Sequence, residues 1–283
     1  MSTQVLDWKR LSLQEREREY SPSIDGDCEP HIRAYAELSA AARCAHPPAT
    51  FRYGRKPSQT LDIFLPIEAS SRPPVVVFFH GGYWQKLSKT ESAFAAPRCL
   101  ARGIAYVAAD YTLAPKADLD EIVLESRAVL SWLERFANVA GIDQNRIVVA
   151  GSSSGAHLAA MTALHSEIVK GAILVSGIYD LEPLIGTSID AALQLDVASA
   201  RRNSPLHLEL TGFPRTVICW GDSETNQTKR QSRAFADALR ARGAVCTELE
   251  ISGRNHFDVI VDLADPQKEL GKHLYGLINS IES

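Results

Sequence analysis

The sequence contains little that would support several common classes of function. Its five cysteines are scattered without a CxxC pair, and no HExxH segment is present, so neither a zinc site nor a disulfide framework is indicated. There is no P-loop and no GxGxxG turn, so nucleotide binding has no support. A formal net charge of −4 at pH 7 disfavours nucleic acid as a partner. We therefore expect no cofactor and no metal.

Long apolar runs are also missing. VVVFF at residues 75–79 is typical of the apolar runs present, and it is far shorter than a membrane span. The charged start of the chain lacks the apolar segment of a secretory signal, and unpaired cysteines suit a reducing compartment. We expect a cytoplasmic protein that acts on a small molecule and has no membrane partner. The oligomeric state is left open, with a homodimer among the alternatives.

What the chain does have is an alternation of strand-like and helix-like segments. Short segments rich in β-branched residues predict strands at 60–66, 73–82, 103–111, 145–151, 169–177, 215–221 and 244–252. Amphipathic patterns predict helices between them, notably at 120–137 and 229–243. This alternation is typical of an α/β protein with a mostly parallel central sheet and helices on both faces. Ligands of such sheets bind beyond the carboxyl ends of the strands.

The length of 283 residues suits a single domain over residues 1–283. Residues 5–45 are polar and predicted to be helical, ending in an alanine-rich stretch before HPP. This N-terminal segment either covers part of the site or only packs against the sheet.

Three consecutive serines lie between two glycines in VVAGSSSGAHL, residues 148–158. A buried strand precedes them and a helical pattern follows, which is the context expected of a G-x-S-x-G nucleophile elbow. Only Ser153 has glycine both two positions before and two positions after it, so Ser153 is the predicted nucleophile. The N–H of Ser154 begins the helix and is expected to point at the site. Without partner residues, the segment could be an ordinary turn rich in serine and glycine.

A second glycine turn, HGGYW at 80–84, follows the apolar run VVVFF. A turn of this type after an early strand supplies backbone N–H donors to an oxyanion in hydrolases with such an elbow. We assign the oxyanion hole to the N–H groups of Gly82, Tyr83 and Ser154. His80 is expected to hold the loop rather than to carry a proton.

A general base should lie in a loop after the last strand, where His256 stands in SGRNHFD. His157 lies on the predicted elbow helix and is expected to pack or to hydrogen-bond. The chain order Ser, Asp or Glu, then His requires a carboxylate between the other two members. Asp222 and Glu224 both directly follow a strand, and position alone does not choose between them. Weaker alternatives are Asp180, Glu182 and Asp196.

Several segments in the correct order carry a specific resemblance. They are HGGYW, DYTLAP (110–115), GSSSGAHLAA, SGIYDLEPL (176–184), RQSRAFADAL (230–239) and NHFD (255–258). Together they resemble the kynurenine formamidase (arylformamidase) branch of the α/β-hydrolases, which is related to the hormone-sensitive-lipase-type esterases. The resemblance covers roughly residues 20–280 and implies an α/β-hydrolase fold.

The resemblance also implies a catalytic triad and no metal. By its G-x-x-D/E turn, Glu224 is the triad acid, together with Ser153 and His256, although aspartate is commoner at that position. Ser154 stands where relatives often carry alanine, which should matter little if only its N–H is used. The implied reaction is cleavage of a small acyl group, as a formamide or ester, from an aromatic leaving group through an acyl-enzyme. The aromatic residues next to the motifs are candidates for the substrate wall: Trp84, Tyr179 and Phe257.

Three other interpretations stay open at this point. A carboxylesterase for other small acyl esters, with no role in kynurenine metabolism, would use the same triad, because fold and triad do not fix the substrate. A non-catalytic α/β-hydrolase scaffold would be expected to lack a triad member, whereas candidates for all three are present. A transferase or decarboxylase on the same fold would differ by excluding water, which the sequence does not reveal.

Overall fold

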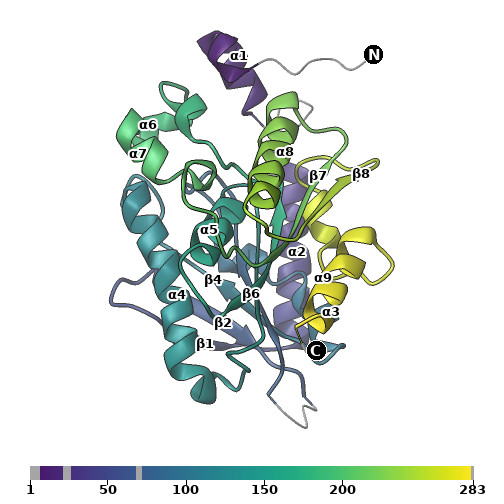
Figure 1. Cartoon of the computed structure of the whole chain (residues 1–283). Helices are drawn as coiled ribbons and strands as arrows, with labels where there is room; N and C mark the ends of the chain where they lie inside the picture. Colours follow the sequence, from purple (N-terminus) through teal and green to yellow (C-terminus); the bar gives the residue numbers. More distant parts are fainter. Residues whose placement is uncertain (1–6, 22–26, 68–71, 282–283) are drawn as a thin grey trace.

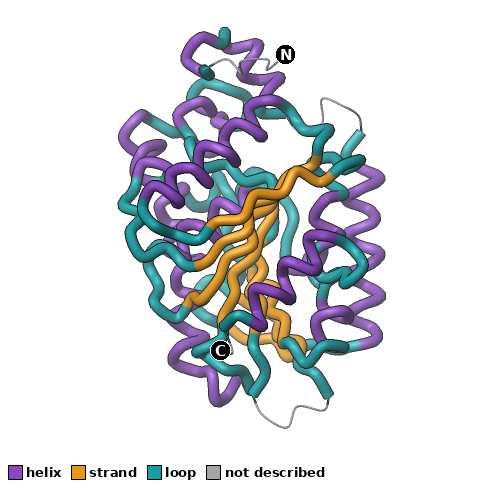
Figure 2. The backbone as a smooth tube through the Cα atoms, turned by 45° about the vertical axis from the view of Figure 1, so that its right-hand side comes forward, coloured by secondary structure: helices purple, strands orange, loops and turns teal. Residues whose placement is uncertain are grey.

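A mostly parallel sheet of eight strands lies at the centre of the protein, between two layers of helices (Figure 1, Figure 2). A computed structural model describes residues 7–21, 27–67 and 72–281. The strands are β1 (Ala49–Arg52), β2 (Thr60–Phe64), β3 (Val75–Phe79), β4 (Ala105–Ala109), β5 (Ile147–Ser152), β6 (Val169–Val175), β7 (Arg215–Gly221) and β8 (Cys246–Ile251). The α-helices are α1 (Leu13–Glu19), α2 (Glu29–Ala45), α3 (Ala96–Leu100), α4 (Leu119–Ala140), α5 (Ser154–Ala163), α6 (Asp190–Leu193), α7 (Val197–Arg202), α8 (Asn226–Ala241) and α9 (Glu269–Asn279).

Short 3-10 helices occupy several connections. They are η1 (Trp8–Arg10), η3 (Lys89–Ser92), η4 (Glu182–Leu184), η5 (Pro205–His207) and η6 (Val259–Asp262).

The strand order is β1-β2-β4-β3-β5-β6-β7-β8. The first two pairs, β1 with β2 and β2 with β4, are antiparallel, and every later neighbouring pair is parallel. The six strands from β4 to β8 in this order therefore end at one edge of the sheet, where ligands of such folds bind. The predicted α/β architecture is confirmed.

Side chains of one strand alternate between two hydrophobic cores, one on each face of the sheet. In β3, Val75, Val77 and Phe79 pack into the core that includes apolar residues of α4, α5 and α8. Val76 and Phe78 pack into the opposite core, with residues of α2, α3 and α9. Burial on both faces explains why the strand sequences read as continuous apolar runs instead of alternating patterns.

Helices occupy much of the described part of the N-terminal segment, which is predicted to be helical over 5–45. It contains η1, α1 and α2, while residues 22–26 between α1 and α2 lie outside the described residues, as do residues 5 and 6. Ser12 starts α1 with a capping box, in which its hydroxyl and Glu15 satisfy each other's backbone N–H groups. Pro30 lies in the first turn of α2, where its missing N–H costs nothing.

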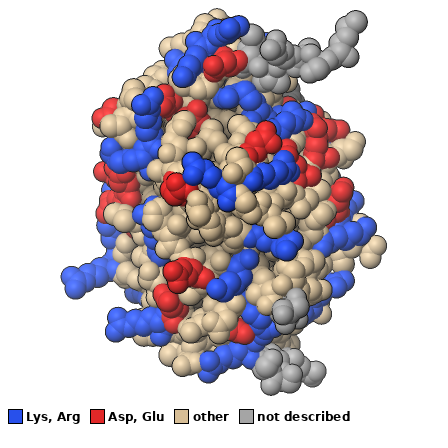
Figure 3. Space-filling model, in the orientation of Figure 1, with Lys and Arg blue, Asp and Glu red and all other residues tan. Residues whose placement is uncertain are grey.

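The face drawn in Figure 3 carries basic and acidic side chains interspersed, in keeping with the small net charge of −4. Among the described residues, no helix combines the length and the hydropathy that crossing a bilayer requires.

Candidate active site

The segment around Ser153 makes a sharp turn from strand β5 into helix α5. Ser153 has φ 57° and ψ −124°, a backbone conformation that L-residues rarely adopt. Gly155 has no room for a side chain, because a Cβ there would lie 2.0 Å from the carbonyl oxygen of Phe79. This strained and closely packed turn places Ser153 at the carboxyl end of the sheet, as the elbow motif predicts.

Ser153 and His256 line one cavity of about 780 Å³. Its wall is formed largely by loops that follow the strands, including Gly82 and Tyr83 after β3 and Phe257 after β8. The volume falls within the range of ordinary small-molecule sites. Residues of α1 and α2 complete the wall, so the N-terminal segment covers part of this cavity.

His256 and Glu224 form a hydrogen-bonded pair. The Nδ1 atom of His256 lies 2.8 Å from Oε2 of Glu224, and the Glu224 side chain is almost completely buried. The other carboxylate oxygen, Oε1, accepts hydrogen bonds from the Ser176 hydroxyl at 2.5 Å and from the Gly221 N–H at 2.7 Å. These two donors fix the carboxylate, so that Oε2 faces the imidazole.

Asp222, the competing carboxylate, points elsewhere. It is exposed, and it accepts hydrogen bonds from the Ser252 hydroxyl at 3.1 Å and the Gly253 N–H at 3.0 Å. It therefore stabilises the turn after β8 instead of contacting the imidazole. Of the two carboxylates that position alone left open, Glu224 is the one in contact with His256.

Ser176 was not singled out by the sequence reasoning. It directly follows β6, with a positive φ of 52°, and its buried hydroxyl contacts the Glu224 carboxylate. The sequence signal for Ser176 was its position: a small residue with a hydroxyl group directly after a buried strand. That strand neighbours β7, which precedes Glu224.

Within the described residues, the Ser153 hydroxyl and His256 are not joined by a direct hydrogen bond, although both line the same cavity. Catalytic hydrogen bonds are often long in ligand-free sites and shorten when the substrate binds. The arrangement thus supplies a hydroxyl, an imidazole and a carboxylate at one edge of the sheet.

Three backbone N–H groups near Ser153 have no acceptor among the described residues. They belong to Gly82, Tyr83 and Ser154. The next N–H in the loop, that of Trp84, instead donates to the Ser154 hydroxyl at 3.3 Å. Unpaired N–H donors beside a candidate nucleophile are the groups that an oxyanion needs.

The hydroxyl of Ser154 therefore has a contact of its own. The Ser154 side chain was expected to matter little if only its N–H is used. The structure adds a role for the hydroxyl, because its Oγ joins the start of α5 to the loop that carries Gly82 and Tyr83.

His80 lies under this loop and is shielded from water. Its ring stacks on Tyr111 at 4.3 Å between centroids, and its Nδ1 lies 2.9 Å from the carbonyl oxygen of Gly81. Tyr111 donates its hydroxyl to the carbonyl oxygen of His80 at 2.9 Å. Burial lowers the pKa of His80 to about 4, so the ring is neutral at neutral pH, which suits a residue that holds the loop.

The aromatic residues expected to wall the cavity differ in their placement. Phe257 lines it and stacks on His31, with ring centroids 5.4 Å apart. Trp84 and Tyr179 are fully buried and are not among its lining residues, so this part of the interpretation is wrong. The Trp84 ring packs edge-on against His157, and Tyr179 stacks on Phe235, because both rings close the core beneath the strand ends.

Hydrogen bonds fasten the N-terminal segment to the site. Tyr83 donates its hydroxyl to the carbonyl oxygen of Tyr20, which follows α1. Tyr35, on α2, donates its hydroxyl to the carbonyl oxygen of Phe257, next to His256. Both loops of the candidate site therefore contact the N-terminal helices directly.

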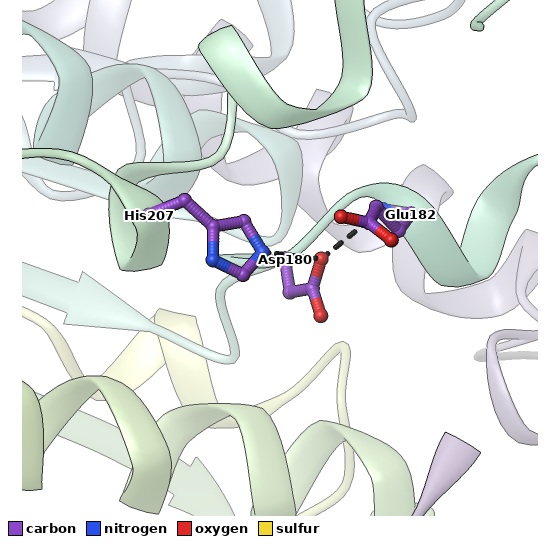
Figure 4. A group of neighbouring side chains, drawn as sticks. All are labelled: Asp180, Glu182 and His207. Carbon is purple, nitrogen blue, oxygen red and sulfur yellow. Dashed lines mark hydrogen bonds and ion pairs between the residues drawn. The ribbon is translucent and has the colours of Figure 1, made fainter. Parts of the chain in front are cut away.

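Asp180, Glu182 and His207 form a group with metal-ligating side chains (Figure 4). Nε2 of His207 lies 3.2 Å from Oδ1 of Asp180, and Glu182 forms an ion pair with Arg201 at 2.5 Å. Asp180 and Glu182 thus each have a partner within the protein, and none of the three residues lines the Ser153 cavity. The two carboxylates, weaker alternatives for the triad acid, lie in this group and not beside His256.

Comparisons with known proteins identify relatives of this chain. A family model described as BD-FAE matches residues 61–183. A kynurenine formamidase of Danio rerio is 34% identical and covers 96% of this chain and 98% of the relative. A kynurenine formamidase of Salmo salar is 32% identical and covers 91% and 94%, respectively.

Among solved structures, a hyperthermophilic esterase from the archaeon Pyrobaculum calidifontis superposes with a TM-score of 0.71 at 20% identity. The superposition covers 95% of this chain and 96% of the esterase. It bears out the expected α/β-hydrolase fold.

Proposed function

Because this chain belongs to the kynurenine formamidase family and is a hydrolase of formamide or ester substrates, we propose that it works as a serine hydrolase with Ser153 as nucleophile. In this proposal His256 is the general base and Glu224 the acid that orients it. The N–H groups of Gly82, Tyr83 and Ser154 form the oxyanion hole.

The proposed reaction runs in two halves. Ser153 Oγ attacks the acyl carbonyl carbon while His256 Nε2 takes the hydroxyl proton, and the negative charge that develops on the carbonyl oxygen is bound by the three N–H donors. His256 then gives its proton to the leaving amine or alcohol as the bond to the acyl group breaks. In the second half, water attacks the acyl-enzyme in the same way, with His256 again as general base. This step releases the acid and restores Ser153.

The observation that carries the proposal is the 2.8 Å contact between His256 Nδ1 and Glu224 Oε2 at the wall of the cavity that holds Ser153. With Nδ1–H donated to a carboxylate, Nε2 is left as the basic nitrogen. The buried carboxylate also favours the imidazolium that forms during the reaction.

We propose N-formylkynurenine as the substrate. Its acyl part is a formyl group and its leaving group is an aryl amine, which calls for an apolar wall on one side of the nucleophile. Phe257, Ile32 and Phe94 line the cavity and supply such a wall. The family relatives named as kynurenine formamidases support the same choice.

The test compares hydrolysis of N-formylkynurenine with hydrolysis of short-chain aryl esters. Wild type, Ser153→Ala and the neighbouring control Ser152→Ala are assayed, and Ser153 is probed by covalent labelling with a fluorophosphonate. We expect Ser153→Ala to lose at least about 10³-fold in kcat, from the cost of removing a triad nucleophile. Ser152→Ala, which does not occupy the apex of the turn, should keep most of the activity and the label.

The outcomes separate the alternatives. Cleavage of esters alone would make the protein a carboxylesterase and leave the triad in place. Absence of both turnover and a Ser153 adduct would instead favour a non-catalytic scaffold.

A further inference from the structure

The loop that carries His256 is anchored on both sides of the imidazole. On one side, the carbonyl oxygen of Arg254 accepts a hydrogen bond from the Ser223 N–H at 3.1 Å, in the turn after β7. On the other side, the carbonyl oxygen of Phe257 accepts the hydroxyl of Tyr35, a residue of α2 that lies 222 positions away in the sequence. The first contact joins the loop to the strand ends, and the second joins it to the N-terminal segment.

Hydrogen bonds within the loop fix its shape but not its position. Oδ1 of Asn255 accepts from the N–H groups of Phe257 and Asp258 at 2.8 and 3.0 Å, and the Asn255 N–H donates to Asp258 at 2.7 Å. His256 lies inside this bonded turn, so the imidazole is expected to move with the turn. The position of the imidazole relative to Glu224 therefore depends on the contacts that the turn makes with other elements.

Helix α2 makes a second contact with the same loop. The ring of His31 stacks on the ring of Phe257, with centroids 5.4 Å apart and planes inclined by 13°. Tyr35 follows His31 by four positions, so both side chains reach the loop from one face of the helix. Two contacts one helical turn apart oppose rotation of the loop as well as its displacement.

Tyr35 is itself held in place. Its side chain packs in the core formed with residues of α3 and α9, and its ring stacks on Phe94 with centroids 5.8 Å apart. Burial raises the pKa of Tyr35, so the hydroxyl keeps its proton and remains a donor at neutral pH. Among the described residues, no other hydrogen-bond donor contacts the carbonyl oxygen of Phe257.

Building on the proposed function, in which His256 is the general base, we infer that Tyr35 is a positioning residue of the reaction. Its hydroxyl, together with the ring of His31, holds the loop so that Nδ1 of His256 stays against Glu224 and Nε2 can reach Ser153. Tyr35 also lines the cavity, but this role requires no contact with the substrate. The N-terminal segment thus contributes to the chemical step in addition to covering the cavity.

The first test is Tyr35→Phe, which removes the hydroxyl and keeps the ring. We expect kcat to fall at least about tenfold with KM changed less than about twofold, because a displacement of about 1 Å at a reacting group can cost about 10²-fold in rate. The matched control is Tyr275→Phe. Tyr35 and Tyr275 are 7% and 8% exposed, and Tyr275 also donates to a backbone carbonyl oxygen, that of Ala264 at 2.6 Å, away from the cavity. Thermal unfolding should show similar losses of stability in both variants, and only Tyr35→Phe should lose kcat.

The stacked ring of His31 allows a rescue experiment. His31→Ala removes the ring that packs on Phe257 and should lower kcat about threefold, the rate equivalent of a lost aromatic pair. His31→Phe restores a ring and should keep kcat close to that of wild type. Equal kcat in the two variants overturns the role assigned to this stack.

A measurement without substrate separates the inference from the proposed function. The proton between Nδ1 of His256 and Glu224 is followed by ¹H NMR as a downfield resonance, assigned by its absence from His256→Asn. Its exchange with water should be at least about threefold faster in Tyr35→Phe than in wild type, because the pair opens more often. In Tyr275→Phe the exchange should be unchanged.

The two proposals can fail separately. If wild type cleaves neither formamide nor ester, the proposed function fails, and faster exchange in Tyr35→Phe still supports the positioning of His256 by Tyr35. The inference is overturned if Tyr35→Phe matches Tyr275→Phe in both kcat and exchange. It is also overturned if Tyr35→Phe raises KM at unchanged kcat, because the hydroxyl would then serve substrate binding.

Discussion

His256 and Glu224 are 32 positions apart in the sequence, yet the Nδ1 atom of one lies 2.8 Å from Oε2 of the other. The strands that precede them, β7 and β8, are parallel neighbours, so the loops at their carboxyl ends meet. Glu224 reaches the imidazole while its second oxygen stays bonded to Ser176 and Gly221. Donors at the ends of β6 and β7 thus hold the Glu224 carboxylate in contact with the imidazole.

This pairing predicts a large difference between two neighbouring carboxylates. Glu224→Gln should lower kcat by about 10⁴-fold, because an amide cannot stabilise the imidazolium and can present its N–H to Nδ1. Asp222→Asn should change kcat less than about threefold, since Asp222 is exposed and bonded to the turn at Gly253. Steady-state kinetics on the same substrate gives both values.

Equal losses in the two variants would contradict the assignment of Glu224. The thermal unfolding midpoint of each variant serves as the control, because a structural role of Glu224 would lower stability and activity together.

A second prediction concerns the backbone of the loop that carries Gly82 and Tyr83, the proposed oxyanion donors. Gly82 has φ 100°, and a Cβ at this position would lie 2.4 Å from the carbonyl oxygen of Lys86. Gly82→Ala must therefore shift the main chain that presents two of the three N–H donors. We expect kcat to fall at least about 10²-fold, the typical cost of losing one such donor.

Gly103→Ala is the matched control for that variant. Gly103 also has a positive φ, 70°, but no atom lies within 4 Å of a Cβ built there. The backbone strain alone should cost about 1 kcal/mol of stability and leave kcat unchanged. Equal kcat for Gly82→Ala and wild type would exclude these N–H groups from the reaction.

The sequence contained most of the information about the strand ends. Apolar runs bounded by glycine predict the parallel strands, and chain order alone places Ser153, a carboxylate and His256 at one edge of the sheet. Position along the chain could not choose between Asp222 and Glu224, because both follow the same strand, and only the G-x-x-D/E turn of the family resemblance favoured Glu224. That choice depends on donors from other strands, such as Ser176, which are distant in the sequence.

Side-chain direction was the other piece of information that the sequence lacked. Trp84 and Tyr179 stand next to motif residues, yet their rings turn into the core, where Trp84 contacts His157 and Tyr179 contacts Phe235. Nor does composition reveal that α1 and α2 lie over the cavity. That arrangement depends on contacts such as Tyr83 with Tyr20, which join segments far apart in the chain.

A third prediction concerns the hydroxyl of Ser154. In Ser154→Ala the buried N–H of Trp84 loses its acceptor, which should cost about 1–3 kcal/mol of stability. Because Trp84 directly follows Tyr83, we also expect the oxyanion donors to be held less firmly and kcat to fall about tenfold. Thermal unfolding and kcat are measured on the same preparation.

Ser126→Ala is the control for this effect. Ser126 is equally buried, and its hydroxyl donates to the Val123 carbonyl oxygen within α4, away from the cavity. Ser126→Ala should be somewhat less stable than wild type, with kcat unchanged. A Ser154 variant that behaves in the same way would limit the role of its hydroxyl to packing.

The last prediction concerns the dependence of stability on pH. His157 is completely buried, with its Nε2 2.6 Å from the carbonyl oxygen of Asn203 and its Nδ1 accepting from Trp84 Nε1 at 3.3 Å. Since a carbonyl oxygen only accepts, Nε2 carries the proton, and a second proton on Nδ1 would face the Trp84 N–H. Burial accordingly lowers the pKa of His157 to about 4.

The sign follows from comparing the folded and unfolded chains. An unfolded histidine has a pKa of about 6.5, so between pH 6.5 and 4 the unfolded chain binds a proton that the folded protein excludes. The free energy of unfolding therefore falls as the pH is lowered through this range, and His80, with a pKa of about 4, adds in the same direction. Burial raises the pKa of Asp110 to about 6. Below pH 6 the folded protein therefore binds a proton at Asp110 that the unfolded chain does not, which increases the free energy of unfolding. This gain offsets the loss from only one of the two histidines.

Replacing His157 with glutamine isolates the contribution of His157 to the pH dependence of stability. A glutamine amide can accept a hydrogen bond from Trp84 and donate one to Asn203, but it does not titrate. Urea unfolding at pH 7.5, 6.5, 6 and 5 should show wild-type stability falling on acidification. In His157→Gln the fall between pH 6 and 5 should be shallower by about 1 kcal/mol per pH unit, the value that one excluded proton contributes. Parallel curves for the two proteins would mean that His157 accepts a proton in the folded state, which its two hydrogen bonds with Trp84 and Asn203 oppose.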